Sequence, residues 1–168
     1  MAHAVQIRSG QENDVPAITE IYNHYVVNTT VTFDVEPYAA DRRRFWFRQF
    51  TPAGRHQIVV AERAGAVVGY AYSTVFRARA AYDSTVETTV YVDRSALRGG
   101  IGTALYTDLF ARLAKSGVHR AIACIALPNE PSIALHERLG FRAKGSLAEV
   151  GHKFGKYWDI GWFEKSIP

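Results

Sequence analysis

The first fifty residues show one strand pattern followed by two helical patterns. Residues 5–8 alternate apolar and polar side chains, which predicts a short first strand. A helix capped by Asn13 or Asp14 is expected to run to about residue 30, because its apolar side chains recur at helical spacing. Asp41 opens a second helix that carries aromatic side chains as far as Phe50.

Three arginines, Arg42, Arg43 and Arg44, follow one another in this second helix. Such a run can bind an anion, but on a surface helix it is more typical of a solvated face. The sequence therefore favours the solvated face and keeps an anion site as the alternative.

Strand patterns dominate the middle of the chain. Residues 57–62 and 67–75 flank a turn at 63–66 and predict an antiparallel pair. After a link at 76–83, residues 84–92 are rich in threonine, valine and tyrosine and predict a third strand.

A glycine-rich turn leads from this strand into a long helix. Its apolar side chains recur every four residues and predict one buried face; they are Ile101, Leu105, Leu109 and Leu113. A buried strand over 120–127, a helix ending near residue 139, and a hairpin of 141–150 with 157–163 follow. This order predicts an α/β (α+β) protein, with helices flanking a mixed, mostly antiparallel sheet.

Composition limits the domain count and the class of partner. The 168 residues carry 20 Lys and Arg against 16 Asp and Glu, and no linker divides them, so residues 1–168 are expected to form a single domain. The net charge of +4 suits an anionic ligand. A nucleic-acid-binding surface would need a basic run interleaved with aromatic residues, and the sequence has none. The one cysteine fits a reducing compartment, and no signal peptide or membrane-spanning run is expected. We therefore expect a cytoplasmic protein with no nucleic-acid or membrane partner.

The turn after residues 84–92 has the chemistry of an anion site. A helix start offers free N–H donors and the positive end of a dipole, and glycines let a phosphate approach the backbone. A Walker loop would need Gly-Lys-Ser/Thr, and a dinucleotide fingerprint would need a third glycine near Leu105. The sequence has neither.

The segment Leu97-Arg98-Gly99-Gly100-Ile101-Gly102 resembles the pyrophosphate loop of the GNAT N-acetyltransferases, whose usual pattern is Gln/Arg-x-x-Gly-x-Gly/Ala. It departs at Leu97, where Gln or Arg is usual. Residues 129–141 are similar to the closing segment of the same family, and the element order matches the GNAT fold along nearly the whole chain. The resemblance implies about seven strands, four helices and a splayed strand pair that holds acetyl-CoA. The residues implied to bind this co-substrate are Val90, Tyr91, Val92, Arg98, Gly99, Gly100, Ile101, Gly102, Thr103 and Asn129.

Longer matches narrow the resemblance to one subfamily. Residues 76–92 are similar to the phosphinothricin and methionine sulfoximine N-acetyltransferases, as are residues 23–25 and 32–33 upstream. Residues 127–132 with 136–137, and residues 151–155, agree downstream. The resemblance implies acetyl transfer to the α-amino group of a small amino-acid analogue: phosphinothricin, methionine sulfoximine or methionine sulfone. A homodimer is the expected assembly.

The reaction needs a base, because an α-amino group is mostly protonated near neutral pH and attacks a thioester only when neutral. Glu87 lies within a strand pattern that disfavours glutamate. Strand alternation places it on one face with Thr89 and Tyr91, opposite Val86 and its neighbours. Taken alone, such a glutamate would more often face solvent; with the resemblance, Glu87 is expected to be the general base, acting directly or through a water.

Two further groups of residues complete the expected site. His136 is expected to protonate or stabilise the CoA thiolate, with Tyr91 and Tyr106 as alternatives. Arg77 and Arg79 supply guanidinium groups suited to a carboxylate together with a phosphinate or sulfoximine-like group. The residues that the resemblance implies for substrate binding are Phe33, Arg77, Arg79, Tyr82, His152 and Lys153.

The remaining candidates have structural explanations. Cys124 lies in an apolar run and is expected in the core. The six histidines show no metal-ligand spacing, so no metal is expected. The alternatives to the amino-acid acetyltransferase are a protein or peptide N-terminal acetyltransferase and a non-catalytic acyl-CoA-binding sensor; Glu87 and His136 argue against the sensor, because binding alone needs neither.

Overall fold

The chain, seen in a computed structural model that describes residues 4–97 and 99–168, has the predicted order of elements. Its helices and strands are β1 Gln6–Ser9, α1 Val15–Asn28, α2 Ala40–Phe47, β2 Ile58–Arg63, β3 Ala66–Val75, β4 Thr85–Val92, α3 Ile101–Leu113, β5 Arg120–Leu127, α4 Glu130–Arg138, β6 Arg142–Lys153 and β7 Lys156–Ser166. None of the helices in this described part is both long and apolar enough to cross a membrane.

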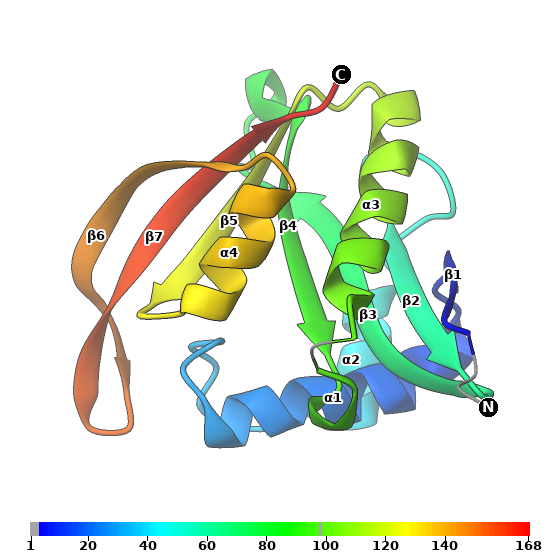
Figure 1. The fold of residues 1–168 in the computed structure, drawn as a ribbon, viewed down its shortest axis with the longest axis horizontal. Coiled ribbons are helices and arrows are strands. Elements are labelled where there is room, and N and C mark those ends of the chain that lie inside the picture. The colour runs from blue at the N-terminus through cyan, green and yellow to red at the C-terminus, as the bar shows by residue number, and fades with distance from the viewer. Residues whose placement is uncertain (1–3, 98) are drawn as a thin grey trace.

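The strands form one seven-stranded sheet in the order β1-β2-β3-β4-β5-β7-β6. All neighbouring pairs are antiparallel except β4 and β5, which run parallel, so the predicted mixed and mostly antiparallel sheet is confirmed. The parallel pair is short: Thr85–Glu87 pair with Arg120–Ile122, and the strands then diverge (Figure 1). This divergence leaves one edge of β4 without a partner strand beyond Glu87.

Helices cover both faces of the sheet (Figure 1). On one face, the four predicted apolar positions of α3 are buried and pack with Val86 of β4. On the other face, α1 packs its apolar stripe against a second cluster that includes Tyr70 and Tyr91. Val86 and Tyr91 thus lie in opposite clusters, which confirms the predicted alternation along β4.

Three details of the helices differ from the prediction. Asp14 precedes α1 but makes no side-chain cap; its carboxylate instead accepts two hydrogen bonds from Arg8 of β1, at 2.7 and 2.8 Å. The second helix ends at Phe47, short of Phe50. Arg43 in that helix is buried, with 5 % of its surface exposed, although a solvated face was expected. The surrounding aromatic rings of Tyr22, Tyr38 and Trp46 explain this burial, because they stack on its guanidinium.

Candidate active site

A cavity of about 270 Å³ lies where β4 and β5 diverge. Residues 87–91 of β4 and 123–126 of β5 form two of its walls. The loop after α1, which Figure 1 shows at the open end of the two strands, contributes residues 31–33. The start of α4 contributes Asn129 and Ser132, and His136 follows one turn later. Most of the residues expected to do chemistry therefore come together at the parallel strand pair.

Glu87 lies at the last position of β4 that pairs with β5, where its partner is Ile122. On the other side of β4 it pairs with Thr74 of β3. Its side chain is half-buried and lines the cavity. Burial raises the pKa of this carboxyl above the usual glutamate value, and the positive charge of Arg77 opposes the shift. A carboxylate of increased basicity, open to a cavity, is suited to accept a proton.

Arg77 and Arg79 lie in the exposed segment that follows β3. Arg77 stacks on Phe76, with its Cζ atom 5.2 Å from the ring centroid, and Tyr82 contacts the same ring edge to face. Arg77, Arg79 and Tyr82 are all exposed and do not line the cavity. Arg77 lies close enough to Glu87 to stabilise its charged form, which puts it at that end of the site.

His136 is almost fully buried, and hydrogen bonds fix its tautomer. Its Nδ1 lies 2.8 Å from the carbonyl oxygen of Ser132, which can only accept, so Nδ1 carries the proton. Burial lowers the pKa of the imidazole, so the ring is neutral and Nε2 accepts the O–H of Tyr106 at 3.2 Å. Tyr106 is fully buried behind the histidine.

The β6–β7 hairpin holds the loop that carries Phe33. The ring of Phe33, which lines the cavity, lies directly on the backbone of Gly151, where an added Cβ would come within 2.2 Å of it. The ammonium of Lys153 donates to the carbonyl oxygen of Thr32 at 2.8 Å, and burial lowers its pKa. His152 is exposed and packs on Tyr157. Phe33 is thus brought to the cavity, whereas Lys153 supports its loop from behind and His152 points elsewhere.

The glycine loop has the open backbone that an anion site needs. Gly100 caps α3 with a φ of +73°, and a Cβ there would meet nothing within 4 Å. Gly102 has a different role: a Cβ at this position would lie 3.1 Å from Leu135 of α4, so this glycine permits close packing of α3 on α4. Arg98 lies outside the described residues.

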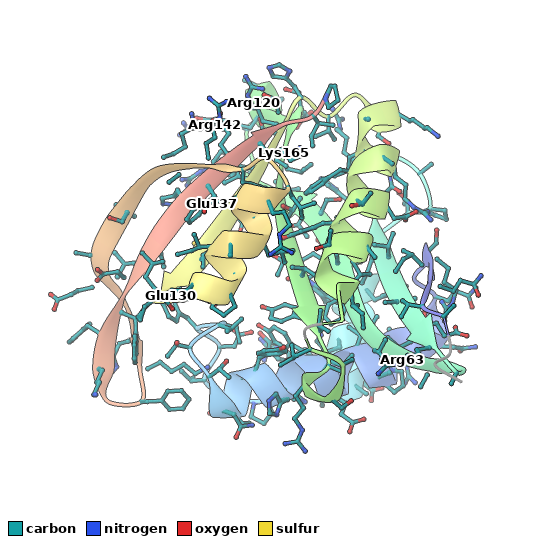
Figure 2. All side chains as sticks on the ribbon, viewed as in Figure 1. Arg63, Arg120, Glu130, Glu137, Arg142 and Lys165 are labelled. Atoms are coloured by element: carbon teal, nitrogen blue, oxygen red, sulfur yellow. The ribbon has the colours of Figure 1, made fainter. Side chains whose placement is uncertain are left out.

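Asn129 caps α4, since its side chain accepts a hydrogen bond from the backbone N–H of Ser132 at 3.3 Å. Glu130 marks the start of this helix and Glu137 lies further along it (Figure 2). The cavity between the diverging strands is suited to the thioester end of a long ligand such as acetyl-CoA, and the glycine-capped start of α3 is suited to its phosphate end. The backbone of Val90, Tyr91 and Val92 would meet its amides, and residues 99–103 would hold its pyrophosphate.

Several wall residues were not expected from the sequence. Cys124, predicted for the core, is exposed to the cavity because β4 turns away before it can cover this part of β5. Burial by the walls, with a smaller effect of the Glu87 carboxylate, raises the thiol pKa to about 11. Tyr22 and Tyr72 also line the cavity. The sequence around these two tyrosines indicates only that they are buried. Thr89 also lines the cavity, and this could have been predicted because strand alternation places it on the same face as Glu87.

Known proteins of similar sequence and fold identify the family. Residues 7–162 match the Acetyltransferase (GNAT) domain. The chain is 47 % identical over 165 residues to a phosphinothricin N-acetyltransferase of Streptomyces coelicolor, covering 97 % of this chain and 96 % of that protein. It is 34 % identical over 164 residues to an L-methionine sulfoximine/L-methionine sulfone acetyltransferase of Pseudomonas paraeruginosa, covering 98 % and 95 %.

A solved structure agrees with these sequences. The crystal structure of a GNAT superfamily phosphinothricin acetyltransferase from Sinorhizobium meliloti, in complex with acetyl-CoA, superposes with a TM-score of 0.92 at 34 % identity. The alignment covers 97 % of this chain and 88 % of that one. The predicted GNAT fold is confirmed, and the chain belongs to the GNAT family of N-acetyltransferases.

Proposed function

We propose that this enzyme transfers the acetyl group of acetyl-CoA to the α-amino group of a small, anionic amino-acid analogue, with Glu87 as the general base. The observation that carries the proposal is the half-buried Glu87 carboxylate, whose pKa burial raises, in the cavity where β4 and β5 diverge. Acetylation of such amines by the purified protein with acetyl-CoA, and its loss in Glu87→Gln, is the test.

The base step follows from the position of Glu87. Its carboxylate accepts a proton from the substrate ammonium, directly or through a water, and leaves the nitrogen lone pair free to attack the thioester carbonyl. The carboxylate is suited to this because its basicity is higher than that of a solvated glutamate. Residues 90–92 pair with β3, but the opposite edge of β4 has no partner strand there, and backbone N–H groups on that edge would stabilise the negative charge that develops on the carbonyl oxygen.

His136 is proposed to protonate or stabilise the departing thiolate. For this its Nδ1–H, the ring's one N–H group in the neutral tautomer, has to leave the carbonyl oxygen of Ser132 to which it donates in this structure. Tyr106, hydrogen-bonded to Nε2 and fully buried, holds this tautomer in place. Tyr91 is also buried and faces the α1 side, which leaves His136 the better placed of the candidates.

The histidine is expected to matter for turnover more than for binding. His136→Gln removes the ring N–H, so kcat should fall on the order of tenfold to a hundredfold while the KM for acetyl-CoA changes little. Steady-state kinetics check this, with Glu137→Gln on the outer part of the same helix as the control. A kcat equal to that of the unsubstituted enzyme would remove His136 from the mechanism.

The glycine loop is proposed to hold the pyrophosphate of acetyl-CoA. Gly100→Ala places a methyl group in the open space beside the start of α3, so the dissociation constant for CoA should rise about tenfold, or ~1.4 kcal/mol. Gly65→Ala is a matched control, because Gly65 also has a positive φ, +80°, and open space around it. Both variants lose about 1–2 kcal/mol of stability from the left-handed backbone. Calorimetry giving equal CoA affinity for the two variants would contradict the assignment.

The substrate class follows from charge and from the relatives. The two relatives described above are named for phosphinothricin and for methionine sulfoximine and sulfone. Arg77 and Arg79 are proposed to bind the carboxylate and the second oxygen-rich group of such an analogue. Phe33 and Tyr82 are proposed to contact its carbon chain. Lys153 is proposed to support the loop that carries Phe33. His152, on the β6–β7 hairpin, is also proposed to contact the substrate. The enzyme is proposed to be a cytoplasmic homodimer. The exposed apolar residues Leu147, Val150, Phe154 and Tyr157 on that hairpin support the dimer.

A protein or peptide N-terminal acetyltransferase is the alternative within the same chemistry. It would need a groove open enough for a polypeptide, and the loop fixed by Lys153 and Gly151 closes one end of this cavity. A binding protein without turnover would need no basic carboxylate at the strand divergence. Both alternatives are therefore less well supported than the small-molecule enzyme.

A further inference from the structure

Arg43 of α2 is an unusual buried cation. It is 5 % exposed, and arginine keeps its charge in proteins, so its burial needs compensation by hydrogen bonds or by a negative charge. Within the described part of the chain, no carboxylate lies within ion-pair distance of its guanidinium. The hydroxyl of Tyr70 is 3.4 Å from Nη2, a long contact, and Nε is buried with no partner among the described residues.

Aromatic faces hold this guanidinium in position. Its Cζ atom lies 3.7 Å from the ring centroid of Trp46, 4.5 Å from that of Tyr22 and 5.7 Å from that of Tyr38. These contacts stabilise a cation but accept none of its in-plane N–H bonds. Apart from the long Nη2 contact with Tyr70, the guanidinium has no hydrogen-bond acceptor among the described residues, and it lines a cavity that an acceptor from outside the chain can enter.

A second cavity, of about 310 Å³, lies against Arg43. Besides Arg43, its charged walls are Arg42 and Asp34, and its aromatic walls include Tyr38, Phe45 and Trp46. Phe45 is 76 % exposed, so its ring is open to a ligand in this cavity. Two cations with a rim of rings suit a flat anion that carries an aromatic body.

The charges also select the kind of anion. A carboxylate matches the fork of an arginine with two parallel hydrogen bonds. Asp34 holds a negative charge on the same wall and accepts a hydrogen bond from Tyr22, so a dianion such as phosphate is disfavoured. The best match is a molecule with one carboxylate and one aromatic ring.

We propose that the cavity between Arg43, Arg42 and the aromatic residues of α2 is a second binding site, distinct from the acetyl-transfer site, for a planar aromatic monocarboxylate. Arg43 binds the carboxylate with the part of its guanidinium that lines the cavity, Arg42 adds a second cation, and Trp46 and Phe45 contact the ring. Tyr22 and Tyr72 line both cavities, so this ligand contacts the back of two walls of the acetyl-transfer site.

Benzoate is the probe for this site, because it has the proposed chemistry and no amine to acetylate. Titration of the full chain, followed by the NMR signals of the Arg43 Nε–H and the Trp46 indole N–H, should give saturable shifts. Benzamide, which has the same shape without the charge, and inorganic phosphate should give none. Absence of saturable shifts with benzoate, or equal binding of benzamide, would overturn the proposal.

Variants separate this site from its surroundings. Arg43→Gln should weaken benzoate binding about tenfold or more, and Arg42→Gln severalfold. Arg44→Gln is the matched control on the same helix: Arg44 is exposed, pairs with Asp41 and lies outside the cavity, so binding should be unchanged. Arg42 is exposed, so its variant keeps the test open if Arg43→Gln does not fold.

Arg77→Gln tells the two cavities apart. Benzoate binding that survives this change but is lost in Arg43→Gln supports the second site. Binding lost in Arg77→Gln and retained in Arg43→Gln would mean that benzoate occupies the acetyl-transfer site, and would overturn the proposal. Neither result depends on acetyl-transfer activity, so failure here is distinct from failure of the proposed function.

Discussion

Glu87→Gln is expected to lower turnover about a hundredfold or more at neutral pH while leaving acetyl-CoA affinity nearly unchanged. Glutamine keeps the shape of the side chain and removes the proton acceptor, so the amine stays protonated and cannot attack. Above the pKa of the substrate amine the free base is already present, and the deficit should shrink. A pH series of kcat, with acetyl-CoA binding measured separately by calorimetry, checks both parts.

The control for this substitution is Glu137→Gln, which changes the same functional group on the outer part of α4 and should leave kcat unchanged. A Glu87→Gln enzyme with near-normal turnover at neutral pH would mean that solvent or another residue takes the proton. A deficit that stays constant up to high pH would indicate a structural effect instead.

The double substitution Arg77→Ala/Arg79→Ala is expected to raise the KM for phosphinothricin by about a hundredfold, because each lost charge-assisted contact costs about 1.5–3 kcal/mol. A plain arylamine has no carboxylate to lose and should change little. The conservative Arg79→Lys change should still raise KM, because lysine keeps the charge but loses the planar pair of donors. Arg63→Ala, at the distant turn between β2 and β3 (Figure 2), is the control.

The same substitution should move the pH profile. Arg77 stabilises the charged form of Glu87, so its removal raises the pKa of that carboxyl further. The acidic limb of kcat/KM, which requires ionised Glu87, should therefore shift to higher pH. Equal losses for phosphinothricin and arylamine, with an unmoved acidic limb, would mean that the arginines act through structure alone.

The sheet and the strand that carries Glu87 could be predicted because local pattern and tertiary packing agree there. The apolar residues of α3 recur on one helical face, and the alternation of β4 survives in the structure because helices cover both faces of the sheet. Glu87, Phe33, Asn129 and His136 therefore reach the cavity as expected.

The errors arise where distant segments decide a residue's surroundings. Cys124 belongs to an apolar run, but the divergence of β4 exposes it, and no local pattern encodes that divergence. Arg43 belongs to a basic run, but aromatic rings from α1 and from the loop before α2 bury it. The ammonium of Lys153 donates to the carbonyl oxygen of Thr32, a contact that no local pattern indicates, and its role in substrate binding stays a prediction.

The most direct test of the proposed function is acetylation of an amine panel by the purified protein with acetyl-CoA. The panel holds phosphinothricin, methionine sulfoximine, methionine sulfone, an arylamine and a short peptide, and mass spectrometry detects the added acetyl group. At least one of the three amino-acid analogues should have a kcat/KM far above those of the arylamine and the peptide, and this activity should be lost in Glu87→Gln. Preference for the arylamine or the peptide, or no acetylation of any analogue, would contradict the proposed function.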